Sequence, residues 1–450
     1  MGGIGHDVFS LIGVGFSFGK AAKKQACLHL NVSDPGKSGL SVNGIARLCQ
    51  QNLVWQAVFR SGKMTFRMKI VADENIPLLN ACFGDMAEIV TLPGRVITAR
   101  DVRDADALLV RSVTPVNDAL VAGSSLRFVG TATAGIDHID SLFLKAHGVG
   151  FASAPGCNAV AVSEYVLAAL DNLAEKYRFS LSGKTAGIVG FGQVGRQVAA
   201  KLDMLGLRVL VSDPLCEQKP GVTFVTLDQL INKADIITLH APLTSEGDYP
   251  TYHMINAQRL AAIKSGAVLI SAGRGAVVDN QALKACLKRG KDLKVVCDVW
   301  ESEPDFDSEL MAKVAIATPH IAGYSLDGKI KGTLQVYQSF CRHFQLRETV
   351  DTKGLFPTTP ELGGFHFGKD VSFYRVMSLL IRAVYDIGRD DTRMRQLGTM
   401  TKTEKCAAFD RMRRQYPVRR ELSAVTVSKP DSRNQWVNHL SALGVHIQKD

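Results

Sequence analysis

Three polar residues in the second half of the chain, Arg274, Glu303 and His320, each follow a short apolar segment. An arginine can hold a carboxylate through two parallel hydrogen bonds, and a histidine can exchange a proton near neutral pH. A nearby carboxylate can orient that histidine and stabilise its charged form. Each residue has a structural alternative, in a turn, at a helix end or in a packed loop. Their succession favours oxidation of a 2-hydroxy acid, provided that a hydride acceptor binds beside them.

A glycine-rich turn could bind that acceptor. Gly190, Gly192 and Gly195 have the spacing G-x-G-x-x-G directly after an apolar, strand-like segment. Apolar residues then recur every three or four positions, which predicts a helix packed on a sheet. The first glycine permits a tight turn, the second lets a pyrophosphate approach the backbone, and the third lets the helix pack on the strand. The phosphates would lie at the positive end of the helix that begins near Gln193.

Asp213 completes this pattern. It follows the next strand-like segment, Leu207–Val211, and lies 213 − 195 = 18 residues after Gly195. A carboxylate there can accept hydrogen bonds from the ribose hydroxyls of a dinucleotide. Pro214 and Leu215 follow where an NADP site would place a basic residue, so the sequence favours NAD. A βαβ turn without a nucleotide is the structural alternative, but strand, turn, helix, strand and acid occur in register.

The composition is that of a globular protein, with 46% hydrophobic and 21% charged residues in a chain of 450, long enough for two or three domains. No apolar run reaches the roughly 18 residues of a membrane span. Of the net charge of +10, residues 1–67 hold +6 (eight basic, two acidic), which leaves 10 − 6 = +4 for the rest. No basic stripe interleaved with aromatics occurs, which argues against nucleic acid. Nine cysteines without paired or metal-ligand spacing predict a reduced, cytoplasmic protein with no bound metal.

Residues 1–67 show no sustained helix or strand period. No basic segment precedes the apolar stretch Val8–Phe18, which argues against a secretory signal. We expect either a flexible extension or sequence upstream of the true start, with Met68 or Met64 as the functional start. From Met68 onward, short apolar segments alternate with helical stretches, which predicts a parallel α/β sheet. These segments are 70–72, 87–92, 107–110, 127–131 and 150–152.

Polar residues follow two of these segments. Arg111 and Ser112 come after one, and the threonine-rich stretch that contains Thr133 comes at the end of the next. Carboxyl ends of strands are where open α/β sheets bind ligands, and a cation with hydroxyls suits an anionic substrate. A surface ion pair is the alternative for Arg111. For His138 a capping or packing role fits better than chemistry.

The sequence therefore predicts two doubly wound, parallel-sheet α/β (Rossmann-like) domains with a cleft between them, and a small C-terminal α+β domain. We expect a substrate-binding domain at 68–160, completed by about 322–350, and an NAD-binding domain at 161–321. We expect Asn158 to cap a helix that crosses between them. The C-terminal domain, 351–450, would contain an amphipathic helix at 370–387, then strand, helix and strand at 422–427, 432–443 and 445–448.

The motifs resemble those of the D-2-hydroxyacid dehydrogenase superfamily. The shared segments are the glycine turn, Gly273-Arg274-Gly275, Asp298-Val-Trp-x-x-Glu303-Pro304 and His320-Ile-Ala-Gly323. Within the superfamily, residues 68 to about 450 are similar to the erythronate-4-phosphate dehydrogenases of pyridoxal phosphate (vitamin B6) biosynthesis. That narrower resemblance depends on the segments Lys69–Asn75, Val110–Thr114, Gly130–His138, Pro155–Ala161, His320–Lys329 and Tyr385–Asp391.

The resemblance implies that Arg274, Glu303 and His320 are catalytic, with His320 as proton donor in the reducing direction. The implied reaction oxidises 4-phospho-D-erythronate to 2-oxo-3-hydroxy-4-phosphobutanoate, and the C-terminal region would form a homodimer. Implied substrate contacts are Ser112, Thr133 and Tyr324. Implied contacts to NAD are Gly190, Gly192, Gln193, Val194, Gly195, Asp213, Ala272, Gly273, Arg274, Asp298 and Gly323.

Two departures from the family pattern stand near the cofactor motifs. Ala241 occupies a position where family members often carry threonine, so we expect one hydroxyl contact to NAD to be absent. Gly273 replaces a frequent cysteine. Two alternatives remain: another dehydrogenase of the superfamily, such as one acting on 3-phosphoglycerate, or an NAD-sensing binding protein on the same scaffold. Turnover of a phosphorylated hydroxy acid would distinguish them.

Overall fold

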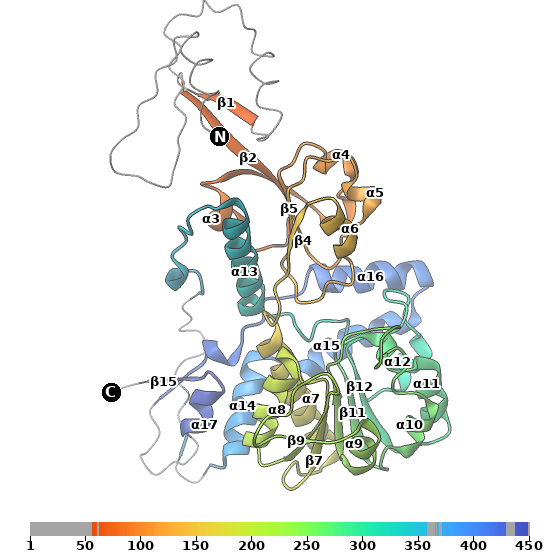
Figure 1. The fold of residues 1–450 in the computed structure, drawn as a ribbon. Helices are drawn as coiled ribbons and strands as arrows, with labels where there is room; N and C mark the ends of the chain where they lie inside the picture. The colour runs from red at the N-terminus through yellow and green to blue at the C-terminus, as the bar shows by residue number, and fades with distance from the viewer. Residues whose placement is uncertain are drawn as a thin grey trace, which may run out of the picture. The chain divides into compact units, whose positions relative to one another are not determined.

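The computed structural model describes residues 56–60, 63–357, 365, 367–368, 371–428 and 437–448. The chain divides into two compact units (Figure 1). The first contains Met1–Ser153 and Val336–Val350, and the second contains Ala154–Gln335 and Asp351–Asp450. The expectation of a flexible or upstream segment at 1–67 concerns mostly residues 1–55, which lie outside the described residues.

The first unit is built on a parallel sheet with the strand order β3-β2-β4-β5-β6. One face is covered by short helices that bury Val102, Leu120 and Leu144 against the strands. On the other face, Phe128 packs edge-on against Phe340 of α13 (Leu326–Phe344). The sheet is thus covered on both faces, as predicted. The strands are β2 (Lys63–Asp73), β3 (Ala87–Leu92), β4 (Ala107–Val110), β5 (Phe128–Thr131) and β6 (Gly150–Ala152).

The first strand of the sheet is longer than the expected segment 70–72. Strand β2 begins at Lys63 and pairs antiparallel with β1 (Gln56–Arg60), with Arg60 opposite Lys63. In the sequence, two strand-like segments flank the two-residue connection Ser61-Gly62. Such a pattern is a hairpin signal. Residues 1–67 as a whole show no sustained helix or strand period, and this concealed the hairpin signal. Pairing with β3 and β4 starts only at Met68 and Ile70, so the hairpin precedes the sheet proper.

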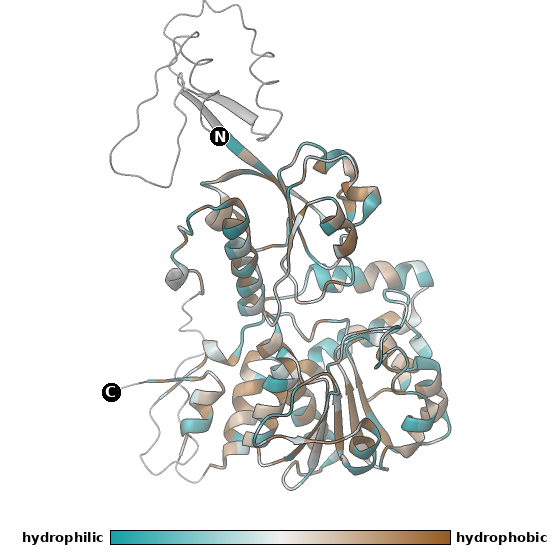
Figure 2. Cartoon of the chain, viewed as in Figure 1, coloured by the Kyte–Doolittle hydropathy of each residue, from teal (hydrophilic) through white to brown (hydrophobic). Residues whose placement is uncertain are grey.

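The second unit contains a seven-stranded, wholly parallel sheet with the order β13-β12-β11-β10-β7-β8-β9. The order reverses between β7 and β10, which is where such sheets bind nucleotides. Its central strands β10 and β11 are buried along their whole length, in keeping with their continuous apolar sequences (Figure 2). The strands are β7 (Thr185–Val189), β8 (Arg208–Ser212), β9 (Thr223–Phe224), β10 (Ile236–Leu239), β11 (Ala267–Ser271), β12 (Leu293–Cys297) and β13 (Ile316–Ala317).

Helices cover both faces of this sheet. One cluster of buried side chains joins the strands to α7 (Ala159–Tyr177) and α8 (Gln193–Met204). The other cluster joins them to α9 (Leu227–Lys233), α10 (Ala257–Ala262), α11 (Asn280–Lys288) and α12 (Ser308–Lys313). Gly206, with φ of +76°, ends α8 in the left-handed conformation that the sequence predicted.

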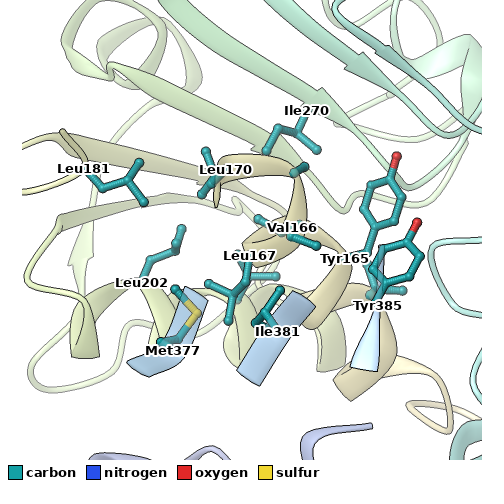
Figure 3. Close-up of a cluster of buried hydrophobic side chains, with 14 of the residues drawn as sticks. Tyr165, Val166, Leu167, Leu170, Leu181, Leu202, Ile270, Met377, Ile381 and Tyr385 are labelled. Carbon is teal, nitrogen blue, oxygen red and sulfur yellow. The ribbon is translucent and has the colours of Figure 1, made fainter. Parts of the chain in front are cut away.

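The C-terminal region is grouped with the second unit. Met377 and Ile381 of α14 (Phe373–Val384) pack on Leu167 of α7 in one continuous core (Figure 3). At the sheet edge, Asp391 of α15 (Ile387–Arg395) accepts a hydrogen bond of 2.7 Å from the amide of Ala317. The expected boundaries at 160, 322 and 351 therefore differ from the observed breaks after Ser153, Gln335 and Val350. Sequence periodicity could not reveal this shared core.

The predicted helix 370–387 is shorter than expected. The Ser372 hydroxyl caps its start by accepting from the amide of Arg375, and α14 ends at Val384. After α16 (Lys402–Arg414), the predicted strand–helix–strand unit is present as β14 (Thr426–Val427), α17 (Val437–Ala442) and β15 (His446–Ile447). Strands β14 and β15 pair in parallel. Residues 422–424 form a 3-10 turn, not a strand, and 432–436 lie outside the described residues.

Candidate active site

The motif residues of the second unit lie on loops that follow β7, β8, β10, β11, β12 and β13. Because β13-β12-β11-β10-β7 are successive neighbours in a parallel sheet, these loops leave the same edge. The sheet order thus explains why segments far apart in the sequence form one site.

The glycine turn has the geometry of a dinucleotide cradle. Gly190 has φ of +87°, and a Cβ there would meet the amide nitrogen of Ala241 at 2.7 Å. A Cβ at Gly195 would lie 2.0 Å from the carbonyl oxygen of Gly190, so only glycine lets α8 pack this closely. By contrast, apart from its two chain neighbours, no described residue has a heavy atom within 4 Å of a Cβ at Gly192. That open position, at the N-terminus of α8, fits a pyrophosphate.

Asp213 is held where the ribose of a dinucleotide would be recognised. Its carboxylate accepts hydrogen bonds from the amides of Phe191, at 2.7 Å, and Leu215, at 3.1 Å. The first of these bonds ties the acid to the glycine turn itself. This hydrogen bond therefore fixes the position of the carboxylate relative to the glycine turn, 22 residues earlier in the sequence.

His240 lies in the loop after β10, where its backbone packs between the glycine turn and the loop after β11 and its Nδ1 atom is buried. Its Nε2 lies 2.8 Å from the hydroxyl of Thr238. Burial lowers the pKa of His240 to about 3, so the ring is neutral. Gly273 completes the packing, because a Cβ there would lie 3.2 Å from the carbonyl oxygen of Leu239.

His320 and Glu303 form a hydrogen-bonded pair. Nδ1 of His320 lies 2.7 Å from Oε2 of Glu303, whose other oxygen accepts from the amide of Trp300 at 2.9 Å. Burial by itself raises the pKa of Glu303, but His320, Arg413 and the Trp300 amide together lower it below its usual value. An ionised carboxylate only accepts, so Nδ1 carries the proton and Nε2 is left for a substrate. The side chain of His320 is 32% exposed.

Asp298 fixes the loop that carries the histidine. Its buried carboxylate accepts from the Thr318 hydroxyl at 2.7 Å and from the amides of Ile321 and Ala322 at 2.8 and 2.9 Å. Its carbonyl accepts from the amide of His320 at 2.7 Å. Asp298, predicted from the resemblance to contact NAD, thus has a structural role that the sequence alone did not reveal.

Arg274 lies at the start of a 3-10 turn after β11, and its Nη1 donates to the carbonyl of Gly273 at 3.0 Å. A Cβ at Gly275 would lie 2.0 Å from the carbonyl oxygen of Trp300, so the glycine brings this loop against the loop of Glu303. Gly323 similarly packs on Asn158, whose Nδ2 would lie 2.6 Å from a Cβ. Asn158 stands at the N-cap position of α7, as predicted, but its side chain makes no capping hydrogen bond.

Two residues of the C-terminal region form hydrogen bonds with the loop that carries His320. Nη2 of Arg419 donates to the carbonyl of Ala322 at 2.6 Å and to that of Ala161 at 3.1 Å. The buried carboxylate of Glu421 accepts from the Ser325 hydroxyl at 2.8 Å and from Nζ of Lys331 at 2.7 Å. Sequence analysis missed both residues, because roughly a hundred positions separate them from the loop they hold.

In the first unit, the predicted substrate residues occupy equivalent positions on neighbouring strands. Val110 and Thr131 are register partners in β4 and β5, and Ser112 and Thr133 each lie two residues beyond. The Thr133 hydroxyl lies 2.8 Å from that of Thr131, which in turn lies 3.1 Å from Nε2 of His138. His138 therefore belongs to a hydroxyl network at this strand end.

Comparison with known proteins agrees with these motifs. Residues 164–322 match the D-isomer specific 2-hydroxyacid dehydrogenase NAD binding domain, and residues 358–444 match a domain of unknown function, DUF3410. The chain is 44% identical over 366 residues to erythronate-4-phosphate dehydrogenase of Shigella flexneri, covering 81% of this chain and 95% of that protein. The chain belongs to the erythronate-4-phosphate dehydrogenase family. The corresponding enzyme of Pseudomonas paraeruginosa is 46% identical over 362 residues, which are 80% of this chain and 95% of that protein.

Members of the erythronate-4-phosphate dehydrogenase family share their fold with other D-2-hydroxyacid dehydrogenases. The crystal structure of NAD-bound 3-phosphoglycerate dehydrogenase from Entamoeba histolytica matches with a TM-score of 0.55 at 22% identity, covering 64% of this chain and 98% of that one. The chain is therefore an NAD-dependent dehydrogenase with two Rossmann-like sheets, as the motifs predicted. Among the described residues, no helix is long and apolar enough to cross a membrane.

Proposed function

We propose that this enzyme oxidises 4-phospho-D-erythronate to 2-oxo-3-hydroxy-4-phosphobutanoate in vitamin B6 biosynthesis. The observation that carries the proposal is the His320–Glu303 pair, which lies on a strand end next to the Arg274 loop and beside a dinucleotide cradle. The family relationship supports the choice of substrate.

In the proposed mechanism, Arg274 binds the substrate carboxylate and polarises the developing carbonyl. Nε2 of His320 takes the proton of the C2 hydroxyl, and the ionised Glu303 stabilises the imidazolium that results. NAD, when bound, accepts the hydride from C2. Gly190, Gly192, Gly195 and the start of α8 at Gln193 and Val194 would hold its pyrophosphate, and Asp213 its ribose. The loop Ala272–Arg274, Asp298 and Gly323 would border its nicotinamide end, with Ser112, Thr133 and Tyr324 contacting the substrate.

The test follows NADH formation by the full-length chain with 4-phospho-D-erythronate, 3-phosphoglycerate and D-lactate in parallel. A 2-oxo acid acceptor is supplied in a second series, so that slow release of NADH does not resemble inactivity. We expect turnover confined to the four-carbon phosphate. A preference for 3-phosphoglycerate would contradict the proposed substrate but leave the proposed mechanism in place. No turnover of any of the three substrates would contradict the proposal that the chain is this enzyme.

A second histidine–glutamate pair offers a matched control. His253 contacts the carboxylate of Glu301, two residues before Glu303, in the same loop system. We expect His320→Gln to abolish turnover and His253→Gln to retain it. Equal losses in both variants would mean that the pairs matter only for the fold.

We further propose that the enzyme is a homodimer formed through its C-terminal region. Leu379 on α14 is 38% exposed although the opposite side of that helix is buried, which leaves apolar surface open. We expect Leu379→Glu to yield monomers in sedimentation. Leu142→Glu, at an exposed leucine of the first unit, should leave the dimer intact. Monomeric wild type would contradict the proposal.

We also place the enzyme in the cytoplasm. All seven cysteines in the described part of the chain are free thiols, and the Cys157, Cys286 and Cys297 side chains are buried. Reduced thiols are the usual state in that compartment. Fractionation of cells that express a tagged full-length chain would test this.

A further inference from the structure

Arg413 brings a charge of the C-terminal region to the catalytic residues. It lies in the last turn of α16. The carbon of its guanidinium group lies 5.9 Å from the centroid of the Tyr324 ring and 6.0 Å from that of Phe409. The Tyr324 side chain is also one of the groups that favour the charged form of Arg413 and raise its pKa. Tyr324 lies four residues after His320, on the loop that Asp298 fixes.

The guanidinium adds positive charge beside the catalytic pair. It is one of the charges that lower the pKa of Glu303. Burial disfavours the charge on Arg413, but Tyr324 and Glu303 more than offset this and raise its pKa, so the cation persists. Glu303 already accepts hydrogen bonds from His320 and from the Trp300 amide. The charge of Arg413 is therefore balanced only in part by that carboxylate.

One donor of this cation is also unused. Nε of Arg413 is buried and, within the described part of the chain, has no hydrogen-bond partner. An unsatisfied buried donor costs about 1–3 kcal/mol, and more on a charged group. Such a group beside a catalytic site is best explained by a ligand that accepts the bond.

We propose that Arg413 is a specificity-determining residue whose guanidinium, together with the Tyr324 hydroxyl, binds the phosphate of the substrate. The inference deepens the proposed function and rests on it. A phosphorylated hydroxy acid has two anionic ends, and this unit supplies one arginine for each: Arg274 for the carboxylate and Arg413 for the phosphate. The planar guanidinium fork matches phosphate oxygens. A substrate without phosphate would leave that fork unpaired, and sites built in this way reject such analogues.

The competing explanation is that Arg413 only holds Tyr324 and Glu303 in place. In that case its loss would weaken all substrates alike, whether or not they carry a phosphate. The ratio of affinities for a phosphorylated and an unphosphorylated ligand, measured on one protein, separates the two explanations. Partial unfolding of a variant cancels from that ratio.

The experiment measures binding by calorimetry to the full-length chain saturated with NADH, so that no turnover occurs. The ligand pairs are 4-phospho-D-erythronate with D-erythronate, and 3-phosphoglycerate with D-glycerate. We expect Arg413→Met to weaken both phosphorylated ligands about 10- to 100-fold and the unphosphorylated ones less than about threefold. Arg413→Lys should be intermediate. Arg414→Met, at the exposed neighbouring arginine, should change nothing.

Equal weakening within each pair, or no change in either, would overturn the role of Arg413. The wild-type protein reports separately on the proposed function. If the wild-type protein binds 3-phosphoglycerate more tightly than 4-phospho-D-erythronate, the proposed four-carbon substrate is wrong. The comparison of 3-phosphoglycerate with D-glycerate would still measure the contribution of Arg413 to phosphate binding.

Discussion

Oε2 of Glu303 lies 2.7 Å from Nδ1 of His320, and the amide of Trp300 holds the other oxygen of that carboxylate at 2.9 Å. The carboxylate is therefore fixed from two sides before any substrate arrives. This geometry orients the imidazole, selects the tautomer with a free Nε2 and favours the protonated ring once the proton has been taken.

Glu303→Gln should lower kcat about 10²- to 10⁴-fold. The amide can still accept from Trp300, but its NH₂ group would face Nδ1 and turn the ring into the wrong tautomer. Because the imidazolium also loses its anion, transfer of the C2 hydroxyl proton to the ring should be slower. Stopped-flow and steady-state assays across pH check this. Glu301→Gln is the control, and a matching loss there would contradict the assignment.

The two glycines of the cradle should respond differently to alanine. Gly192→Ala places its methyl group in open space, so the free energy of unfolding should change by less than about 0.5 kcal/mol while NAD binds about 10- to 100-fold more weakly. Gly195→Ala forces a methyl group onto the carbonyl of Gly190 and should destabilise the fold by about 1–3 kcal/mol or more. Urea unfolding and NAD titration distinguish the two effects, and similar results for both variants would argue against a pyrophosphate at Gly192.

His240 should make stability depend on pH. Burial lowers its pKa from the ordinary value of 6.5 to about 3 in the folded chain. Between these two pH values the folded ring stays neutral while the unfolded ring is protonated. Its contribution is fully present above pH 6.5 and is lost as the pH falls toward 3, by about 1.4 kcal/mol per pH unit. Urea unfolding between pH 4 and 8 should show a shallower acid slope for His240→Gln than for the wild type. An unchanged slope would mean that other groups dominate.

Glu421→Ala should damage both stability and catalysis. It removes a buried carboxylate and leaves the Ser325 hydroxyl and the partly exposed Lys331 ammonium without their acceptor, which should cost about 1–3 kcal/mol. Because Ser325 lies on the histidine loop, kcat should fall even in the fraction that remains folded. Urea unfolding and active-site titration with NADH separate these effects. A stability loss with unchanged kcat would limit Glu421 to a role in the fold.

Much of this structure was predictable because its signals are local. Strands at 87–92, 107–110 and 150–152 occur at the predicted residues, since each is a short apolar run between polar turns. The glycine turn was also predictable, because the spacing of its glycines follows from the geometry of one strand and one helix. Arg274, Glu303 and His320 could be proposed as site residues because each lies in the loop that follows a strand.

The contributions of the C-terminal region could not be predicted in this way. Arg413, Arg419 and Glu421 are ordinary helix and loop residues in the sequence, and their importance comes from contacts across roughly a hundred positions. Amphipathic helices in that region indicated burial but not the partner. Only the fold shows that α14 shares a core with α7, and that the C-terminal residues contact the histidine loop.

The shared core also sets the order of events during synthesis. All seven strands of the nucleotide-binding sheet and every residue of the Arg274–Glu303–His320 set leave the ribosome before Arg413, Arg419 and Glu421 do. Until then the surface of α7 that α14 covers is bare, and the loop after β13 lacks the partners that hold it. For about a hundred residues of further translation, a nascent chain therefore carries the Arg274, Glu303 and His320 loops without the C-terminal contacts that hold them.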